Sequence, residues 1–200
     1  MITKISSGPG RPRSFDPEAA LILGQQMFHA RGYEGVGLAA LTEALGIKPP
    51  SFYKAFGSKA EFFARILERY SRSVLALEDI LLPGRPPAEA LAELLEGAAV
   101  TYASDPQQPG CLVLEAARGC ADEESAIMAR RAAAQRRNQI REFVALTHPD
   151  AADSVTDYVA SVMSGLSASA REGTGAARLT VVARAATEGV RALLAAPKNA

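Results

Sequence analysis

Apolar residues recur every three or four positions along most of the chain, which is the spacing of one face of a helix. The first such segment begins at Asp16, which can cap a helix, and Pro17 fits the first helical position. Gly32 ends this segment, whose apolar positions are Ala20, Leu23, Met27 and Phe28. Residues 1–14 are rich in Gly, Pro and Ser, so we expect them to form a flexible basic arm.

Two short helices are predicted next. Leu38, Leu41 and Leu45 share one face of the first, which ends at Gly46. Two prolines follow soon after, and a helix tolerates proline only in its first turn, so the second is predicted to start near Lys48. Two short helices joined through a glycine have the spacing of a helix-turn-helix unit.

A long fourth helix is predicted from Ser58, because Ser58 and Glu61 have the Ser-x-x-Glu spacing of a capping box. An apolar stripe then continues to Leu81, so we expect the helix to run for about 25 residues, about 37 Å, until Pro83. The stripe consists of Phe63, Ile66, Leu67, Tyr70, Val74, Leu77 and Leu81. A helix of that length would connect the N-terminal unit mechanically to the rest of the chain.

Further helices are predicted over 88–104, from 111, over 122–147 and in two closing segments, with a loop over 105–110. The closing helices each carry an apolar stripe, and small residues such as Gly165 and Ala183 would let helix axes approach closely. Two such helices per subunit suit a four-helix dimer interface. We expect that interface to contain Val155, Val159, Val162, Leu166, Leu179, Val182, Ala186 and Val190.

Composition favours an all-α fold, because the chain is rich in Ala, Leu, Arg and Glu and has no Trp. No apolar run reaches the roughly 18 to 20 residues that span a bilayer, and the first residues lack the apolar core of a signal peptide. We therefore expect a cytoplasmic protein without membrane contact. No phosphate loop, metal-ligand cluster or nucleophile–base pair is present at a suitable spacing, so we expect neither enzyme activity nor a metal or cofactor.

The formal net charge of zero hides an uneven distribution. Residues 1–59 contain seven Lys and Arg and four Asp and Glu, and seven minus four gives +3, which leaves −3 for the remaining chain. A basic N-terminal part suits a protein that binds nucleic acid through one end. In the third helix Phe52 and Phe56 are four residues apart and should point inward. The opposite side then carries a small, polar and cationic set drawn from Lys48, Ser51, Tyr53 and Lys54. An ordinary solvated helix face with surface lysines is the alternative for this side.

The segment LTEALGIKPPSFYKAFGSK, from Leu41 to Lys59, resembles the helix-turn-helix signature of TetR and AcrR family transcriptional regulators. Their pattern has a Leu-Gly-Val turn, a recognition helix centred on Tyr, and a Phe-x-Ser-Lys exit. The resemblance covers the first 70 residues strongly and the later helices in general layout. It implies a TetR-like fold, with a three-helix DNA-binding domain over 15–60 and a helical ligand-binding and dimerisation domain over 61–200.

The resemblance also implies a function. A homodimer would bind a palindromic operator in double-stranded DNA and regulate transcription, and a small-molecule effector would release it. Repression is the family's usual mode, and activation stays open. By carry-over, the major groove would meet Lys48, Pro49, Pro50, Ser51, Tyr53 and Lys54, with Tyr53 and Lys59 mainly on phosphates.

Two features extend or depart from this pattern. The family usually has Ser or Thr where the second helix starts, but Val36, Gly37 and Leu38 stand here, so a phosphate contact would have to come from backbone N–H groups. Arg11 and Arg13 lie in a Gly-Arg-Pro-Arg segment that resembles the core of an AT-hook, which binds the minor groove. The alternative is a disordered basic tail.

The helix predicted from 122 has acidic residues at its start and five arginines later, which complements the helix dipole. A second nucleic-acid surface or a site for an acidic ligand is the alternative. The effector cavity is expected from residue type alone, and for each candidate plain core is the favoured alternative. The candidates are Tyr102, Leu114, Arg118, Met128, Phe143, Tyr158 and Met163. A helical enzyme or carrier that uses this cavity is the alternative function.

The two cysteines, Cys111 and Cys120, are too few for a disulfide framework. They are either buried structural residues or sensors of oxidants and electrophiles. His29 and His148 lie far apart in the sequence and lack metal-ligand spacing, so we interpret both as incidental.

Overall fold

The computed structural model describes residues 15–119 and 123–196, and every regular element among them is a helix. The predicted all-α fold is therefore confirmed. Arg11, Arg13, Cys120 and Asp122 lie outside the described residues. The elements are α1 (Pro17–Arg31), α2 (Leu38–Ala44), α3 (Pro49–Phe56), α4 (Lys59–Ser73), α5 (Leu77–Ile80), α6 (Pro87–Tyr102), α7 (Leu112–Gly119), α8 (Glu123–Ala145), the 3-10 turn η1 (Pro149–Ala151), α9 (Ala152–Arg171) and α10 (Ala176–Ala195).

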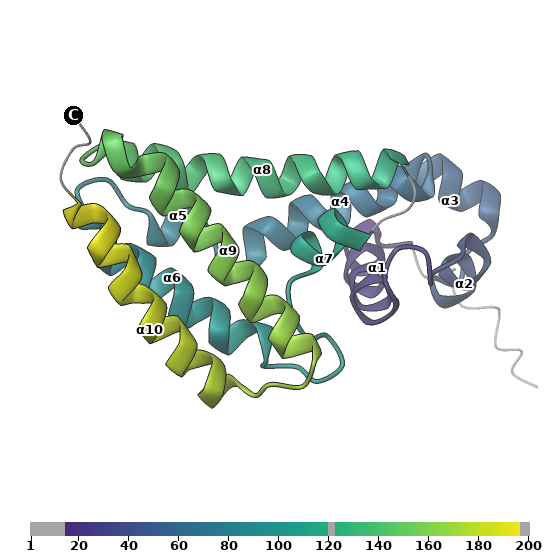
Figure 1. The fold of residues 1–200 in the computed structure, drawn as a ribbon. Coiled ribbons are helices and arrows are strands. Elements are labelled where there is room, and N and C mark those ends of the chain that lie inside the picture. The colour runs from purple at the N-terminus through teal and green to yellow at the C-terminus, as the bar shows by residue number, and fades with distance from the viewer. Residues whose placement is uncertain (1–14, 120–122, 197–200) are drawn as a thin grey trace, which may run out of the picture.

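The helices form a small N-terminal unit at one end of an elongated body (Figure 1). α1, α2 and α3 gather at that end, and α4 leads from them into the body, where it packs against α8. α10 packs on α6 and α9, which together form the other end. α8 runs along one edge of the body, so one helix touches both the α4 side and the α9 side.

The N-terminal unit has an aromatic core in which α1, α3 and α4 meet. Phe28, Phe52, Phe56, Phe62 and Phe63 are all at most 1% exposed. The ring centres of Phe56 and Phe62 are 4.5 Å apart, and those of Phe28 and Phe63 are 4.8 Å apart. Such pairs stabilise the unit beyond the area they bury. The inward direction expected for Phe52 and Phe56 is confirmed.

The predicted length of the fourth helix was wrong. α4 ends at Ser73, so it has 15 residues and not about 25. Val74 is extended and Leu75 has a φ of 51°, a left-handed conformation that costs energy for a residue with a Cβ atom. Leu77 is nonetheless buried, because it starts the separate helix α5. The apolar residues therefore keep their helical spacing through residues 74–76, although the helix itself is interrupted there.

The apolar stripes of α9 and α10 face the chain's own core, so most of the residues predicted for the dimer interface are already buried without a partner. Six of the eight are buried within the single chain: Val155, Val159, Leu166, Leu179, Ala186 and Val190. Val162 is half-buried, and Val182 is 52% exposed. A stripe marks the side of a helix that meets apolar surface, and for these helices α6 and α8 supply that surface. The exposed positions include Val181 and Val182 on α10 and Ser161 and Gly165 on α9.

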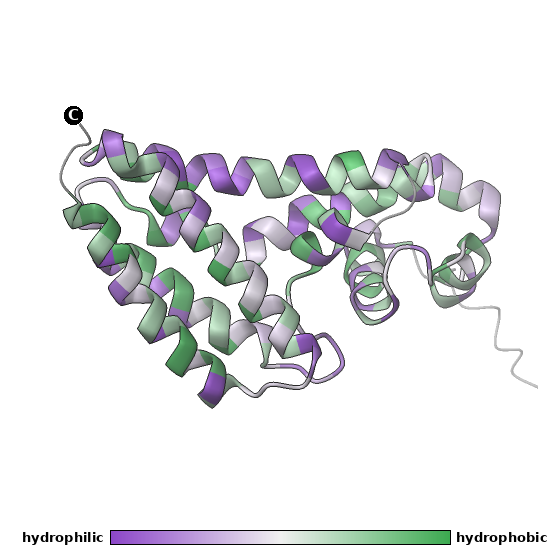
Figure 2. Cartoon of the chain, viewed as in Figure 1, coloured by the Kyte–Doolittle hydropathy of each residue, from purple (hydrophilic) through white to green (hydrophobic). Residues whose placement is uncertain are grey.

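Hydropathy differs between the helices of the body (Figure 2). Hydrophobic residues recur along the whole of α10, whereas hydrophilic residues recur along α8. Among the described helices, none combines the length and the apolar composition needed to cross a membrane.

Candidate nucleic-acid interface and internal cavity

The turn between α2 and α3 is held by its backbone. Gly46 has a φ of 64°, which glycine adopts without steric cost, and the N–H of Ile47 donates to the Thr42 carbonyl at 3.0 Å. Lys48 is then extended and precedes Pro49 and Pro50 in the first turn of α3. The predicted start of the third helix is confirmed. These backbone constraints fix the direction in which α3 leaves the turn.

The start and outer side of α3 present to solvent the six side chains that the family resemblance placed toward the major groove. All six are exposed, and they are Lys48, Pro49, Pro50, Ser51, Tyr53 and Lys54. Tyr53 is 52% exposed although its neighbour Phe52 is fully buried. The outer side of α3 therefore offers two cations and two hydroxyl groups on a rigid helix, a set that suits phosphates and base edges. Their contact with DNA stays a prediction.

Lys59 has a structural partner that the sequence did not indicate. Its Nζ atom donates to the Tyr33 carbonyl at 2.8 Å and lies 3.8 Å from the centre of the Tyr33 ring. Lys59 thereby holds the turn after α1 against the start of α4. The phosphate contact expected for Lys59 stays a prediction.

Arg65 is a further cation near α3 that sequence analysis missed. Its Nη1 atom donates to the carbonyl of Ala55 at 3.3 Å, and its guanidinium lies 5.8 Å from the centre of the Phe56 ring. The side chain belongs to α4 but satisfies a carbonyl in the last turn of α3. No motif distinguishes Arg65 from other exposed helical arginines, so only the packing of α3 on α4 reveals it.

An internal cavity of about 40 Å³ lies where α5, α6, α7, α8 and α9 meet. Three of the seven predicted effector residues, Tyr102, Leu114 and Met163, line it. The residues that join them are mainly apolar, and the complete lining adds Leu77, Cys111, Val113, Ala133, Arg136, Arg137, Ile140 and Ala160. The cavity is thus lined by helices of the regulatory body and has few polar groups, a trait of small-molecule sites, although its volume is well below the roughly 300 Å³ or more that such sites usually have.

The other four effector candidates lie elsewhere. Met128 lines an open groove between α4 and α8, and Phe143 borders a separate hollow beside α5. Tyr158 lies against Gly189 of α10. A Cβ atom added at Gly189 would lie 2.3 Å from the Tyr158 hydroxyl oxygen. Arg118 forms an ion pair with Glu115 on its own helix. The structure therefore does not bring these four into the cavity, because helical faces, not residue type, decide which side chains meet.

Two buried tyrosines accompany Cys111 beside the cavity. Burial raises the pKa of Tyr70 and the pKa of Tyr102, and the neighbouring Cys111 thiol raises both further. The Arg136 guanidinium acts in the opposite direction on both pKa values. Both phenols therefore stay protonated in the neutral pH range and keep an O–H group to donate. Cys111 itself is buried, which fits the structural interpretation of this cysteine.

Known proteins are similar to this chain over almost its whole length. Residues 23–66 match the family model described as bacterial regulatory proteins, tetR family. The transcriptional repressor BdcR of Escherichia coli is 41% identical over 196 residues, which cover 97% of this chain and 99% of BdcR. The chain belongs to the TetR family. The repressor ComR of Escherichia coli is 27% identical and covers 90% of both chains.

One of the similar solved structures is a TetR family regulator in complex with DNA. A cysteine mutant of the regulator CifR, complexed with 26-base-pair double-strand operator DNA, has a TM-score of 0.78 and 33% identity. The match covers 90% of this chain and 98% of the CifR chain. The chain is thus a DNA-binding transcriptional regulator of the TetR type. The hypothesis of a transcriptional regulator is therefore kept, and the alternative of a helical enzyme or carrier is rejected.

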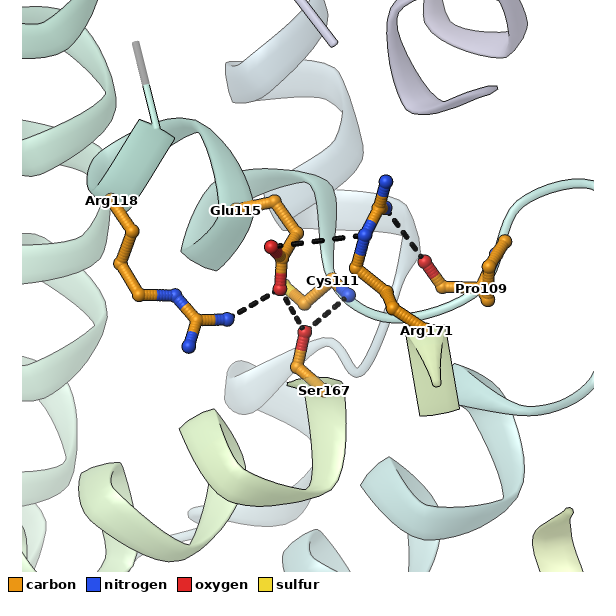
Figure 3. A network of polar contacts seen from close by, with 6 residues as sticks. All are labelled: Pro109, Cys111, Glu115, Arg118, Ser167 and Arg171. Carbon is orange, nitrogen blue, oxygen red and sulfur yellow. Dashed lines mark hydrogen bonds and ion pairs between the residues drawn. The ribbon is translucent and has the colours of Figure 1, made fainter. Parts of the chain in front are cut away.

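In this TetR-family chain, a polar network ties α7 to the end of α9 (Figure 3). Ser167 accepts a hydrogen bond from the Cys111 N–H at 2.9 Å and donates to Glu115 at 2.9 Å. Arg171 donates to the Pro109 carbonyl at 3.1 Å and lies 3.8 Å from Glu115. The network fixes the loop before α7, and with it the backbone that positions Cys111 at the cavity.

His29 lies where the N-terminal unit meets that loop. It is 4% exposed, and its Nε2 atom has no hydrogen-bond partner among the described residues. Burial, and then the nearby Arg171 guanidinium, lowers the pKa of His29 below its ordinary value of 6.5. His29 is therefore neutral at pH 7, although the carbonyls of Pro109 and Gly110 act in the opposite direction. The interpretation of His29 as incidental missed this contact between domains.

Proposed function

We propose that this TetR-family regulator is a repressor that binds a palindromic operator as a homodimer and leaves it when a small molecule occupies the internal cavity. The exposed outer side of α3 is the observation that carries the proposal. Its cations and hydroxyl groups stand on a helix whose opposite side is locked into an aromatic core. The relatives BdcR and ComR, both repressors, support repression for this chain.

The dimer is supported by the exposed sides of α9 and α10. Val181 is 68% exposed and Val182 is 52% exposed, and they are adjacent on one helix. On α9 the small residues Ser161 and Gly165 are exposed, which lets a partner helix approach closely. A symmetric pair would present two copies of α3 to half-sites one helical turn apart, about 34 to 36 Å.

Release by an effector is supported by where the cavity lies. Its lining includes Leu77 of α5, which directly follows α4, and Arg136 of α8, which contacts the end of α4. α4 in turn carries Phe62 and Phe63 of the aromatic core beneath α3. A ligand that prefers one position of α4 would shift the population of DNA-competent dimers.

Selection of bound genomic fragments with the purified protein, followed by footprinting, tests the operator. We expect one palindromic site at a promoter and increased transcription from that promoter when the gene for this protein is removed. Decreased transcription would make the protein an activator.

Two substitutions test the DNA-contacting side of α3. The double variant Tyr53→Ala, Lys54→Ala should lose operator affinity by about tenfold or more, because base and phosphate contacts are worth about 1 to 3 kcal/mol each. The control Arg130→Ala removes an exposed cation from α8 and should bind like the wild type. Wild-type affinity in the double variant would contradict the assignment of α3.

A further inference from the structure

One arginine contacts both the cavity and the end of α4. Arg136 of α8 donates through Nη1 to the Ser71 carbonyl at 2.8 Å and through Nη2 to the Leu75 carbonyl at 2.9 Å. These carbonyls belong to the last turn of α4 and to the left-handed residue that follows it. The same side chain lines the cavity beside Tyr102 and Cys111. Arg136 is therefore the direct link between a ligand space and the helix that carries the DNA-binding unit.

The charge of Arg136 is balanced only in part. Arg137 and Arg141, on the same helix, form ion pairs with Asp157 and Asp153. Among the residues that the structure describes, no carboxylate forms an ion pair with Arg136. Its partners are the Ser71 carbonyl in the last turn of α4, at a helix end that carries about half a negative charge, and the neutral Leu75 carbonyl just beyond it. A full negative charge in the neighbouring, mainly apolar cavity would attract the guanidinium more strongly.

We propose that the effector is a small carboxylate with a compact apolar body, and that its carboxylate draws Arg136 away from the Ser71 and Leu75 carbonyls. This inference rests on the proposed function, because it takes the cavity to be the effector site. Arg136 is the residue that both recognises the ligand and transmits its arrival.

The cavity's size and hydrogen-bonding groups limit the ligand further. A volume of about 40 Å³ has room for about three water molecules, so the ligand has only a few non-hydrogen atoms. The Tyr102 hydroxyl and the Arg136 guanidinium both offer donors, which suit an acceptor such as a carboxylate oxygen. A cationic ammonium group would meet Arg136 with like charge and is excluded.

Loss of the Arg136 contacts would release the end of α4. The Ser71 and Leu75 carbonyls would lose charge-assisted hydrogen bonds, and Leu75 could leave its left-handed conformation. The other end of α4 carries Phe62 and Phe63, which pack in the core beneath α3. Movement of α4 would therefore change where the outer side of α3 points.

The recognition step is tested with three probes of similar size: propanoate, propanamide and propylammonium. Their binding to the full-length protein is measured by calorimetry and thermal unfolding at constant ionic strength. Propanoate should bind and raise the Tm, propanamide should bind about tenfold more weakly, and propylammonium should not bind. Arg136→Gln should abolish the response to propanoate. The control Arg141→Gln, which removes an exposed cation paired with Asp153, should keep it. Equal binding of propanoate and propanamide, or no binding of propanoate, would overturn the proposal.

Operator affinity tests the transmission step. Propanoate should weaken operator binding of the wild type by about tenfold, while Arg136→Gln should bind the operator weakly with or without propanoate. If Arg136→Gln does not fold, Arg136→Lys serves instead: it keeps the charge, so propanoate still binds, but it lacks the two-pronged contact with both carbonyls. Wild-type operator affinity and response in a folded variant would overturn the proposal. Absence of any operator would count against the proposed function alone, since the binding measurements need no DNA.

Discussion

The ammonium group of Lys59 donates to the Tyr33 carbonyl and at the same time lies over the face of the Tyr33 ring. Lys59→Met keeps the length of the side chain and removes both interactions. We expect the free energy of unfolding to fall by about 1 to 2 kcal/mol, the combined worth of a charged hydrogen bond and a partly exposed cation–π contact. Chemical denaturation measures it.

Lys54→Met is the matched control for Lys59→Met, because Lys54 is exposed on α3. It should leave the free energy of unfolding within about 0.5 kcal/mol of the wild type. Unchanged stability in Lys59→Met, with loss of DNA affinity alone, would show that Lys59 acts on phosphate and not as a structural contact.

Gly24 lets α1 pack directly on α4. A Cβ atom at this position would lie 2.5 Å from Cε1 of Phe62 and 2.8 Å from Cδ1 of Ile66. Gly24→Ala should therefore destabilise the protein by about 1 to 3 kcal/mol, despite the better helix propensity of alanine. Gln26→Ala, at an exposed position of the same helix, should be neutral. A Tm for Gly24→Ala at or above the wild-type value would show that the aromatic core yields easily.

His29 should make stability depend on pH. Its folded-state pKa lies below 6.5, whereas the unfolded chain binds the proton near pH 6.5. Unfolding therefore takes up a proton, so the contribution is fully present above about pH 6.5 and is lost as the pH falls toward the folded-state pKa. The groups that set this pKa include Arg171, Asp105 and the loop carbonyls.

Urea unfolding at pH 7.5 and pH 5.5 measures the His29 contribution. His29→Gln should reduce the loss of stability between the two pH values, by no more than about 1.4 kcal/mol per pH unit. His148→Gln removes the other histidine and should leave the loss unchanged. An identical pH dependence in the wild type and His29→Gln would mean that other groups control it.

Val182 provides a test of the proposed dimer. Val182→Asp places a charge on the exposed side of α10 and should shift the protein toward monomer in sedimentation at micromolar concentration, with loss of operator affinity. Ile127→Asp is matched in exposure, 50% against 52%, and lies on α8. It should leave the dimer intact. A dimer that survives in Val182→Asp would place the interface elsewhere.

Local signals in the sequence predicted the N-terminal unit well. The capping box of Ser58 and Glu61, the two prolines and Gly46 each act within a few residues, and the helices begin and end where these signals stand. The outer side of α3 could also be predicted, because the spacing of Phe52 and Phe56 defines its inner side. The α4 break could not be predicted in this way, since Leu75 is held by Arg136, 61 residues further along.

The lining of the cavity and the burial of the closing helices could not be predicted for a related reason. An apolar stripe shows that a helix side is buried but not which helix covers it. Val155 and Val190 were therefore expected at a dimer interface, whereas the single chain already buries both. Tyr102, Leu114 and Met163 meet only because α6, α7 and α9 surround one space. Residue type alone could not separate them from Phe143 or Tyr158.

The aromatic core of the N-terminal unit extends into α4, beyond the boundary at residue 60 that the sequence indicated. Phe62 and Phe63 follow that boundary directly and pack on Phe28 and Phe52. A fragment that ends at residue 60 would lack part of its own interior and expose the rest. Exchange of DNA-binding units between proteins of this kind therefore requires a junction after Ser73, so that α4 travels with the unit whose specificity is being transplanted.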